Sequence, residues 1–195
     1  MYLITDLVHL RVRLTTAYRA GIPTAAKPGM PTDFLTLLQR DHGDLQTELT
    51  QLLDPIATVS QLRSALDGLR LGLTAHAEAE DIVLARFEAI SAVEGLVRVG
   101  RGAHLAQEGA LAALVSSRPG TKAWRDRAYH LRDLVHSHAE HEEQHLLPAL
   151  REHSPRMYAA LAGAFATERL RQLAMLQPSV PLSLADLALA EAQAS

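Results

Sequence analysis

Six histidine and glutamate residues recur in this chain at a spacing that suits a metal site. They are His42, His76 and Glu80 in one half of the chain, and His104, His138 and Glu142 in the other. A shift of 62 residues carries the first set onto the second. Imidazole nitrogen and carboxylate oxygen, without sulfur, favour iron or manganese, and zinc also accepts them. The repeat predicts two similar helical hairpins, each with one His on its first helix and a His-x-x-x-Glu motif on its second.

The number of these groups indicates a pair of ions. Four imidazoles and two carboxylates exceed what one tetrahedral zinc ion requires. They suit two ions that each take two histidines, with the carboxylates spanning the pair. All six residues lie on the apolar stripe of a predicted helix, where His and Glu four residues apart point the same way. Because an unpaired polar group is costly to bury, a shared metal partner explains why so many of them face the core.

The segment HAEHEEQHLLP contains a competing metal motif. From His141 to His145 it reads HEEQH, which fits the HExxH pattern of zinc proteases. The 62-residue shift places these histidines on Ala79 and Val83, so neither belongs to the repeat. A helical bundle also lacks the sheet edge that holds an extended peptide. We therefore assign the chemistry to the frame that starts at His138, and we expect His145 to line the pocket or to contact a ligand.

The elements that must position these residues are helices. Strand signals are nearly absent, whereas apolar residues repeat at three- and four-residue steps. The periodic segments run from Thr32 to Pro55, from about Ser60 to Phe87, from Val93 to the Pro119-Gly120 turn, and from Thr121 to Leu150. Short connections between long helices predict an all-α, antiparallel up-down four-helix bundle. A ferritin-like carboxylate site is not supported, because it needs two Glu-x-x-His pairs and the chain has one.

The predicted bundle has helical extensions at both ends. We divide the chain into an N-terminal helix and connector (1–31), the four-helix bundle (32–153) and a C-terminal helical extension (154–195). The pair Ser154-Pro155 is a suitable cap and first turn for a fifth helix. The terminal helices are expected to cover the bundle or to form a homodimer.

Composition excludes several classes of function. The chain has 195 residues, 19 basic and 22 acidic side chains and a formal charge of −3, without the basic excess that nucleic acid or an anionic membrane would attract. It contains no cysteine, which excludes disulfides and thiolate sites and favours a reducing compartment. We find neither a signal peptide nor a run long enough to cross a membrane. A cytoplasmic protein is therefore expected.

The motifs around the four histidines resemble those of the hemerythrin-like, or HHE cation-binding, family. They are RDH at His42, HAEAED at His76, AHLAQE at His104 and HAEHEEQHLLP at His138, and the resemblance covers roughly residues 33 to 152. It implies a four-helix bundle that holds a non-haem di-iron centre. Carried over by position, His42 and His76 would bind one iron and His104 and His138 the other. Glu80 and a carboxylate of the fourth helix would bridge the two ions.

Two positions depart from the oxygen-carrying members of that family. Those proteins have a second His four residues after the third-helix His, where this chain has Glu108. They also use an acid five residues after the fourth-helix His, which is Glu143 here, whereas the internal repeat selects Glu142. We predict that Glu142 is the bridge. For Glu108, a ligand, an acceptor for the N–H of a ligand histidine and an exposed helix residue all stay open.

The resemblance also implies the class of function. The expected cofactor is a pair of iron ions with a bridging oxo or hydroxo group, with manganese or zinc as alternatives. The expected role is to bind or sense a small oxidant, namely O₂, peroxide or nitric oxide. Two alternatives stay open: a di-iron redox enzyme that consumes peroxide or nitric oxide, and an iron donor or reservoir for the repair of iron centres. The sequence does not decide whether the protein is an enzyme.

Overall fold

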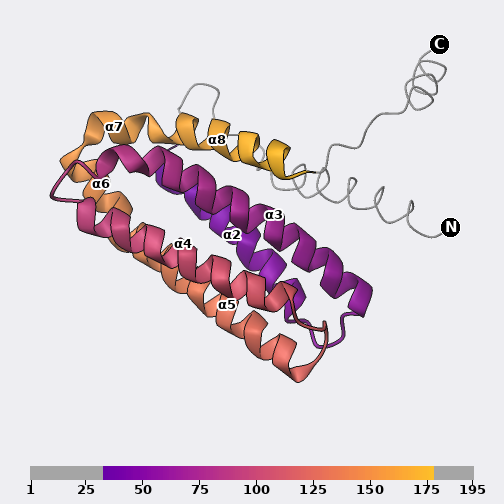
Figure 1. Ribbon diagram of the computed structural model, residues 1–195. Coiled ribbons are helices and arrows are strands. Elements are labelled where there is room, and N and C mark those ends of the chain that lie inside the picture. Colours follow the sequence, from indigo (N-terminus) through magenta and orange to yellow (C-terminus); the bar gives the residue numbers. More distant parts are fainter. Residues whose placement is uncertain (1–32, 178–195) are drawn as a thin grey trace, which may run out of the picture.

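Four long helices form the body of the protein. In the computed structural model, which describes residues 33–177, they are α2 (Phe34–Leu52), α3 (Val59–Leu84), α4 (Glu94–Val115) and α5 (Lys122–His141). Figure 1 shows them packed side by side, with consecutive helices joined by short connections. No strand occurs between residues 33 and 177, so the prediction of an all-α bundle is confirmed. The predicted N-terminal helix and the tail after Pro178 lie outside the described residues.

Side-chain caps set the starts of two bundle helices. The Thr58 hydroxyl accepts a hydrogen bond from the backbone N–H of Gln61, and the Gln61 side chain accepts one from the N–H of Thr58. This reciprocal pair satisfies two of the N–H groups that a helix start leaves free. Thr121 caps α5 in the predicted place, by accepting from the N–H of Trp124 at 3.2 Å. At the start of α2 the N-cap is Asp33 rather than the predicted Thr32.

The predicted fourth helix is not continuous. It changes at Glu142 into a π-helix, Glu142–Leu146, and then continues as α6 (Leu147–His153). The N–H of Leu147 bonds to the carbonyl of Glu142, five residues earlier instead of four. Pro148 has no N–H, and its ring crowds the carbonyl four residues before it, which favours a break in the α-helical pattern here. Such wide turns often occur at functional sites, and this one contains a predicted ligand.

Two apolar clusters enclose the layer that holds the histidines. One contains Leu45 and Val135, and the other contains Leu38. Along α2, His42 lies between Leu38 of one cluster and Leu45 of the other, and all three side chains are buried. Each fully buried leucine contributes about 1.5–3 kcal/mol through removal of apolar area from water. The polar layer therefore lies in a dry part of a core that is stable on both sides of it.

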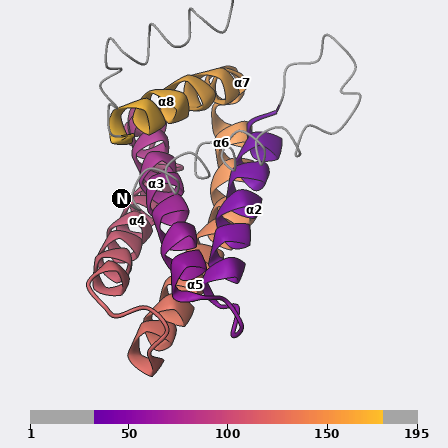
Figure 2. The same ribbon diagram turned by 90° about the vertical axis from the view of Figure 1, so that its right-hand side faces the viewer.

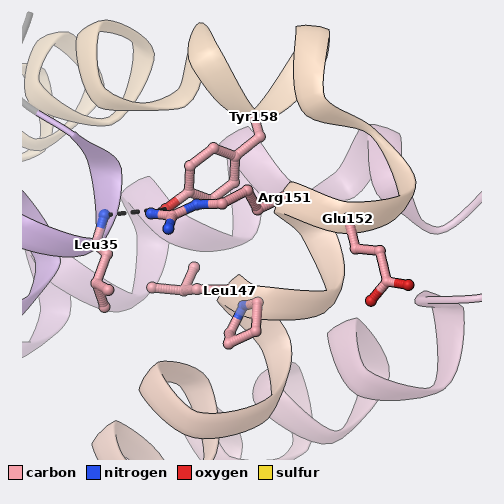
Figure 3. A pocket seen from close by; sticks show the side chains of 6 residues that line it. Leu35, Leu147, Arg151, Glu152 and Tyr158 are labelled. Carbon is pink, nitrogen blue, oxygen red and sulfur yellow. Dashed lines mark hydrogen bonds between the residues drawn. The ribbon is translucent and has the colours of Figure 1, made fainter.

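Between residues 154 and 177, the C-terminal extension consists of two helices where a single one was predicted. They are α7 (Pro155–Ala159) and α8 (Leu161–Leu176), separated at Ala160. Figures 1 and 2 show α8 outside the four-helix bundle, beside α3. At the end of the bundle, the Tyr158 hydroxyl accepts hydrogen bonds from the Leu35 N–H (3.3 Å) and from Arg151 (3.1 Å), as Figure 3 shows. These bonds attach α7 to the start of α2.

Within the described part of the chain, no helix combines the length and the apolar character that a membrane span requires.

Candidate metal centre

The bundle brings together the six residues that the repeat selected. All six are buried, with 0 to 6% of their surface exposed. Their nitrogen and oxygen atoms form two overlapping groups, and within each group the atoms lie within 4.8 Å of one another. One group is His76, Glu80, His104 and His138, and the other is His42, His76 and Glu142. His76 belongs to both, which places it at the middle of the set.

Glu142 lies between histidines of the two hairpins. Its Oε2 is 3.2 Å from His42 Nε2 on α2, and its Oε1 is 3.2 Å from His138 Nε2 on α5. The side chain is fully buried at the first residue of the π-helix. One carboxylate thus reaches a histidine from each half of the repeat, as a bridging ligand would.

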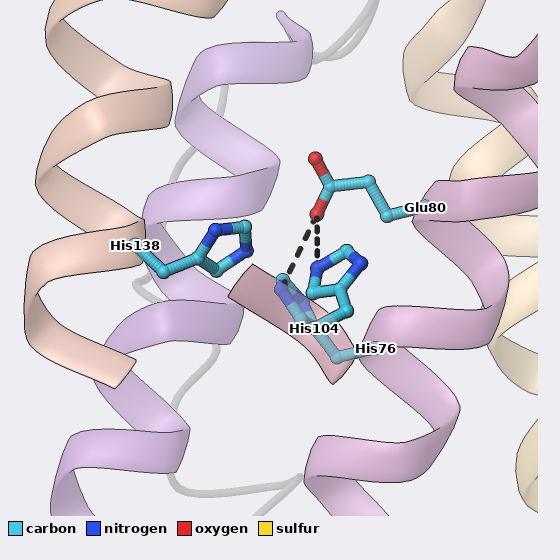
Figure 4. A group of neighbouring side chains, drawn as sticks. All are labelled: His76, Glu80, His104 and His138. Atoms are coloured by element: carbon cyan, nitrogen blue, oxygen red, sulfur yellow. Dashed lines mark ion pairs between the residues drawn. The ribbon is translucent and has the colours of Figure 1, made fainter. Parts of the chain in front are cut away.

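Glu80 occupies the equivalent place on α3. Figure 4 shows its Oε2 directed at two imidazoles, with distances of 3.3 Å to His76 Nε2 and 3.8 Å to His104 Nε2. His138 faces the same space from α5. The two carboxylates therefore have matching positions, each between one histidine of the first hairpin and one of the second.

Three of the four histidines are oriented by a carboxylate at Nδ1. The pairs are His42 with Glu143 (2.8 Å), His76 with Asp41 (2.8 Å) and His104 with Asp81 (2.9 Å). An ionised carboxylate can only accept, so Nδ1 carries the proton in each pair. The lone pair of a neutral imidazole is then on Nε2, which faces the interior. This is the arrangement that holds a ligand histidine in its metal-binding tautomer.

His138 has no such partner: its Nδ1 is buried and makes no hydrogen bond. The repeat explains the difference. Asp81 and Glu143 are related by the 62-residue shift, and each bonds a histidine of the other hairpin. The same shift carries Asp41 onto Ala103, whose methyl group accepts nothing. The two halves of the site are therefore chemically unequal.

Burial shifts the pKa values of four of the six groups. It raises the pKa of Glu142 to about 7, and together with the charge of Glu142 it raises the pKa of Glu80 well above its usual value. Burial also lowers the pKa of His76 to about 4, despite the hydrogen bond to Asp41, and it lowers the pKa of His138. Without a cation, this interior therefore favours the neutral rings of His76 and His138 and the protonated carboxyls of Glu80 and Glu142.

The inward-facing atoms lie close to one another but make no hydrogen bonds, which tests whether metal ions fit. No hydrogen bond reaches Nε2 of any of the four histidines, or either oxygen of Glu80 and Glu142, although all these atoms are buried. Leaving a polar atom buried without a partner costs about 1–3 kcal/mol. Cations bound to these lone pairs would supply the missing partners. The donor set of four imidazoles and two carboxylates therefore fits metal ions.

The structure leaves three other candidate residues outside both groups. Glu143 contacts His42 from the Nδ1 side, so its carboxylate faces away from the inward-directed nitrogen. His145 is exposed and its ring lies 5.6 Å from that of His141, so the HExxH histidines pair with each other outside the site. Glu108 is exposed on α4 and belongs to neither group. Next to it, Gln107 is buried and follows His104 by three residues on the inward face of α4.

The acids at Nδ1 were missed as a group, although part of their signal is visible in the sequence. Asp81 and Glu143 each follow a bridging glutamate and are related by the repeat. Asp41 precedes His42 but bonds His76, a partner on another helix that no local spacing indicates. Gln107 corresponds to the buried Leu45 in the repeat, so a polar side chain occupies a core position that is apolar in the first half.

The comparison with known families agrees with this geometry. The family model of the hemerythrin HHE cation binding domain matches residues 33–163. The chain belongs to this family. No curated protein and no solved structure matches the chain. The HHE match contains all six buried residues and the acids at Nδ1, and it ends within α8.

Two pockets lie at the surface of the HHE domain. The pocket in Figure 3, of about 230 Å³, is mostly apolar, includes Leu147 and Arg151, and shares no residue with the two buried groups. A second pocket, of about 420 Å³, lies between α2 and α5 and is lined in part by His42 and Glu143. It connects solvent with the His42 side of the metal centre.

Acidification is expected to weaken metal binding by the HHE domain. Because the pKa of Glu142 is raised to about 7 and that of Glu80 is raised as well, the metal-free carboxyls hold protons that a cation must displace. Each displaced proton lowers the apparent affinity by about tenfold per pH unit below the pKa of its group. Competition titrations of Zn²⁺ against a chromogenic chelator, at about pH 8 and about pH 6, measure this change. Equal affinities at the two pH values would contradict it.

Proposed function

We propose that this protein holds two iron ions between the six buried residues and binds a small oxidant there, namely O₂, peroxide or nitric oxide. The observation that carries the proposal is the position of the two carboxylates, each between histidines of both hairpins. That geometry suits a pair of ions with an oxo or hydroxo bridge. Bound iron would supply a redox-active centre that interacts with small oxidants.

The protein's own residues prepare the site for this role. The acids at Nδ1 orient three of the imidazoles, as described above, so little reorganisation is needed when ions bind. The apolar clusters on both sides exclude bulk water. The pocket beside His42 gives a solute a route toward the buried groups.

Gly100 on α4 favours a small ligand. A Cβ at this buried position would lie 3.7 Å from Glu142 Oε1 and 4.0 Å from His138 Cε1, which is ordinary contact distance. The equivalent residue in the first half of the repeat is Leu38, which fills its place in the core. Glycine inside a helix costs about 0.5–1 kcal/mol relative to alanine. The missing side chain leaves a space of about one methyl group beside the site. Binding of a diatomic molecule or peroxide in this space would offset the cost of the glycine.

The Gly100→Ala variant tests the proposal. Purified wild-type protein is expected to contain two irons per chain, with an oxo-bridge absorption band that shifts on addition of azide or nitric oxide. Gly100→Ala is expected to keep both irons but to bind azide at least about tenfold more weakly, because the methyl group occupies the ligand space. Iron analysis and spectral titration measure both quantities.

The matched control is Gly102→Ala, on the same helix at a position where a Cβ would meet nothing within 4 Å. It should leave azide affinity unchanged. Wild-type protein without iron would refute the proposal. Equal azide binding by the two alanine variants would refute the assignment of the ligand space to Gly100.

A redox enzyme is the second candidate. The pocket that reaches His42 and Glu143 would allow a substrate such as peroxide to approach and a product to leave. Consumption of peroxide or nitric oxide over many turnovers would favour this enzyme over a binding or sensing protein. Iron that dissociates readily, without a defined small-molecule adduct, would instead favour an iron donor or reservoir.

A further inference from the structure

Helix α8 contacts the metal centre although it lies outside the four-helix bundle. Phe165 on α8 packs its ring against His76, with the ring centroids 6.0 Å apart and the planes at 78°. One turn later, Arg169 binds the Asp41 carboxylate, which in turn bonds His76 Nδ1. Two residues of α8 thus act on the histidine that belongs to both buried groups.

The contact between Arg169 and Asp41 is close and well shielded. Arg169 Nε is 2.9 Å from both carboxylate oxygens, and Arg169 Nη2 is 2.8 Å from Oδ1. The two side chains are only 13% and 14% exposed. Gly72 on α3 lies beside this pair: a Cβ there would be at ordinary contact distance, 3.9 Å, from Arg169 Nη2. Multiple bonds from one guanidinium fix the plane of a carboxylate as well as its position.

This arrangement is confined to His76. Asp81, which bonds His104, has a weaker cation partner in Arg101. The distance from Arg101 Nε to Asp81 Oδ2 is 3.9 Å, and the Arg101 side chain is 41% exposed. His138 has no carboxylate at Nδ1, because Ala103 replaces Asp41 in the second half of the repeat. The family match ends at residue 163, so the α8 residues that contact the site lie beyond it.

We propose that α8 is a working part of the metal centre and that Arg169 is a positioning residue, which acts through Asp41 to hold His76 in its metal-binding orientation. This inference rests on the proposed function, because it concerns how tightly the site holds metal. Arg169 fixes the Asp41 carboxylate. Asp41 then accepts the proton of His76 Nδ1, and the Nε2 lone pair stays directed at Glu80 and the other imidazoles.

The first measurement is the affinity of Arg169→Gln for Fe²⁺, by anaerobic equilibrium dialysis of the full chain. Loss of the group that bonds a ligand histidine directly typically costs about 10- to 100-fold in metal affinity. Because Arg169 acts through Asp41, we expect a loss at the lower end of that range, about tenfold. Arg171→Gln is the matched control, because Arg171 lies on the same helix, is half exposed and bonds Glu168 within α8. It should bind Fe²⁺ like the wild type.

A double-mutant cycle with Asp41→Asn separates positioning from general loss of stability. If Arg169 acts through Asp41, Arg169→Gln should cause little further loss of affinity in the Asp41→Asn background. In metal-free protein, the His76 ring N–H should give a slowly exchanging proton resonance that Arg169→Gln weakens or shifts and Arg171→Gln does not.

Each outcome decides the inference. Additive losses in the cycle, or an unchanged His76 resonance in Arg169→Gln, would overturn it. Equal Fe²⁺ affinity in wild type and Arg169→Gln would overturn it while leaving the proposed function intact. A wild-type protein that takes up no Fe²⁺ would overturn both.

Discussion

Replacing His76 with alanine is expected to abolish metal binding, and His138→Ala should do the same. His76 lies in both buried groups, and His138 is 3.2 Å from the Glu142 carboxylate. Removal of either ring takes away an inward-facing nitrogen and leaves its carboxylate neighbour buried without it. Because loss of an outer partner alone costs about 10- to 100-fold in affinity, loss of a ligand should exceed about 100-fold. Metal analysis of protein purified from iron-supplemented cultures measures the effect.

The control for this experiment is His141→Ala. His141 is part of the HExxH motif, is only partly buried and lies outside both groups. The variant should keep its metal and its absorption spectrum. Loss of metal in His141→Ala as complete as in His76→Ala would restore the zinc-protease interpretation and contradict the site described above.

Replacing both bridging glutamates with methionine is expected to stabilise the metal-free protein. The carboxyls of Glu80 and Glu142 are fully buried, adjacent and without hydrogen bonds to the rest of the protein, and burial raises the pKa of each. Methionine has a similar volume and no polar atoms to desolvate. Exchanging a buried polar cluster for apolar side chains of similar size can stabilise a protein by about 1–4 kcal/mol. We expect Glu80→Met/Glu142→Met to show a gain within that range.

Urea unfolding in the presence of a chelator measures this gain in the free energy of unfolding. When the experiment is repeated with added Fe²⁺ under anaerobic conditions, we expect the wild type to be the more stable of the two proteins. Wild type should be strongly stabilised by the metal, because an ion that binds only the folded state shifts the folding equilibrium. The double variant should not respond. Glu140→Met, at an exposed position on α5, is the control and should change neither measurement. A metal-free double variant less stable than wild type would show that the buried carboxyls stabilise the fold by themselves.

Both predictions follow from one expectation: the buried polar residues serve metal binding and do not stabilise the metal-free fold. Glu80 and Glu142, which we expect to destabilise the metal-free core, are expected to stabilise the protein when ions are bound. Retaining them is therefore costly unless the protein binds metal, which is the physical basis for the assignment.

Much of the fold and the set of buried groups could be predicted from the sequence, because both depend on local periodicity. Apolar residues at three- and four-residue steps specify which face of a helix is buried, and His76 and Glu80 share that face because they are four residues apart. The internal repeat then indicated that His42 and His104 face the same interior. The family match confirms the predicted family, and the helices between residues 33 and 177 confirm the predicted all-α fold class.

What the sequence by itself determined is which side chains turn inward, because helical phase and the cost of burying polar groups are local properties of the chain. Only the tertiary structure decided which of them meet. Asp41 and Arg169 are separated by 128 residues, and their pairing depends on how α8 packs beside α3. The same holds for Glu143, which reaches His42 across two hairpins. Contacts between distant segments depend on packing angles and on small residues such as Gly72, and no periodic pattern encodes them.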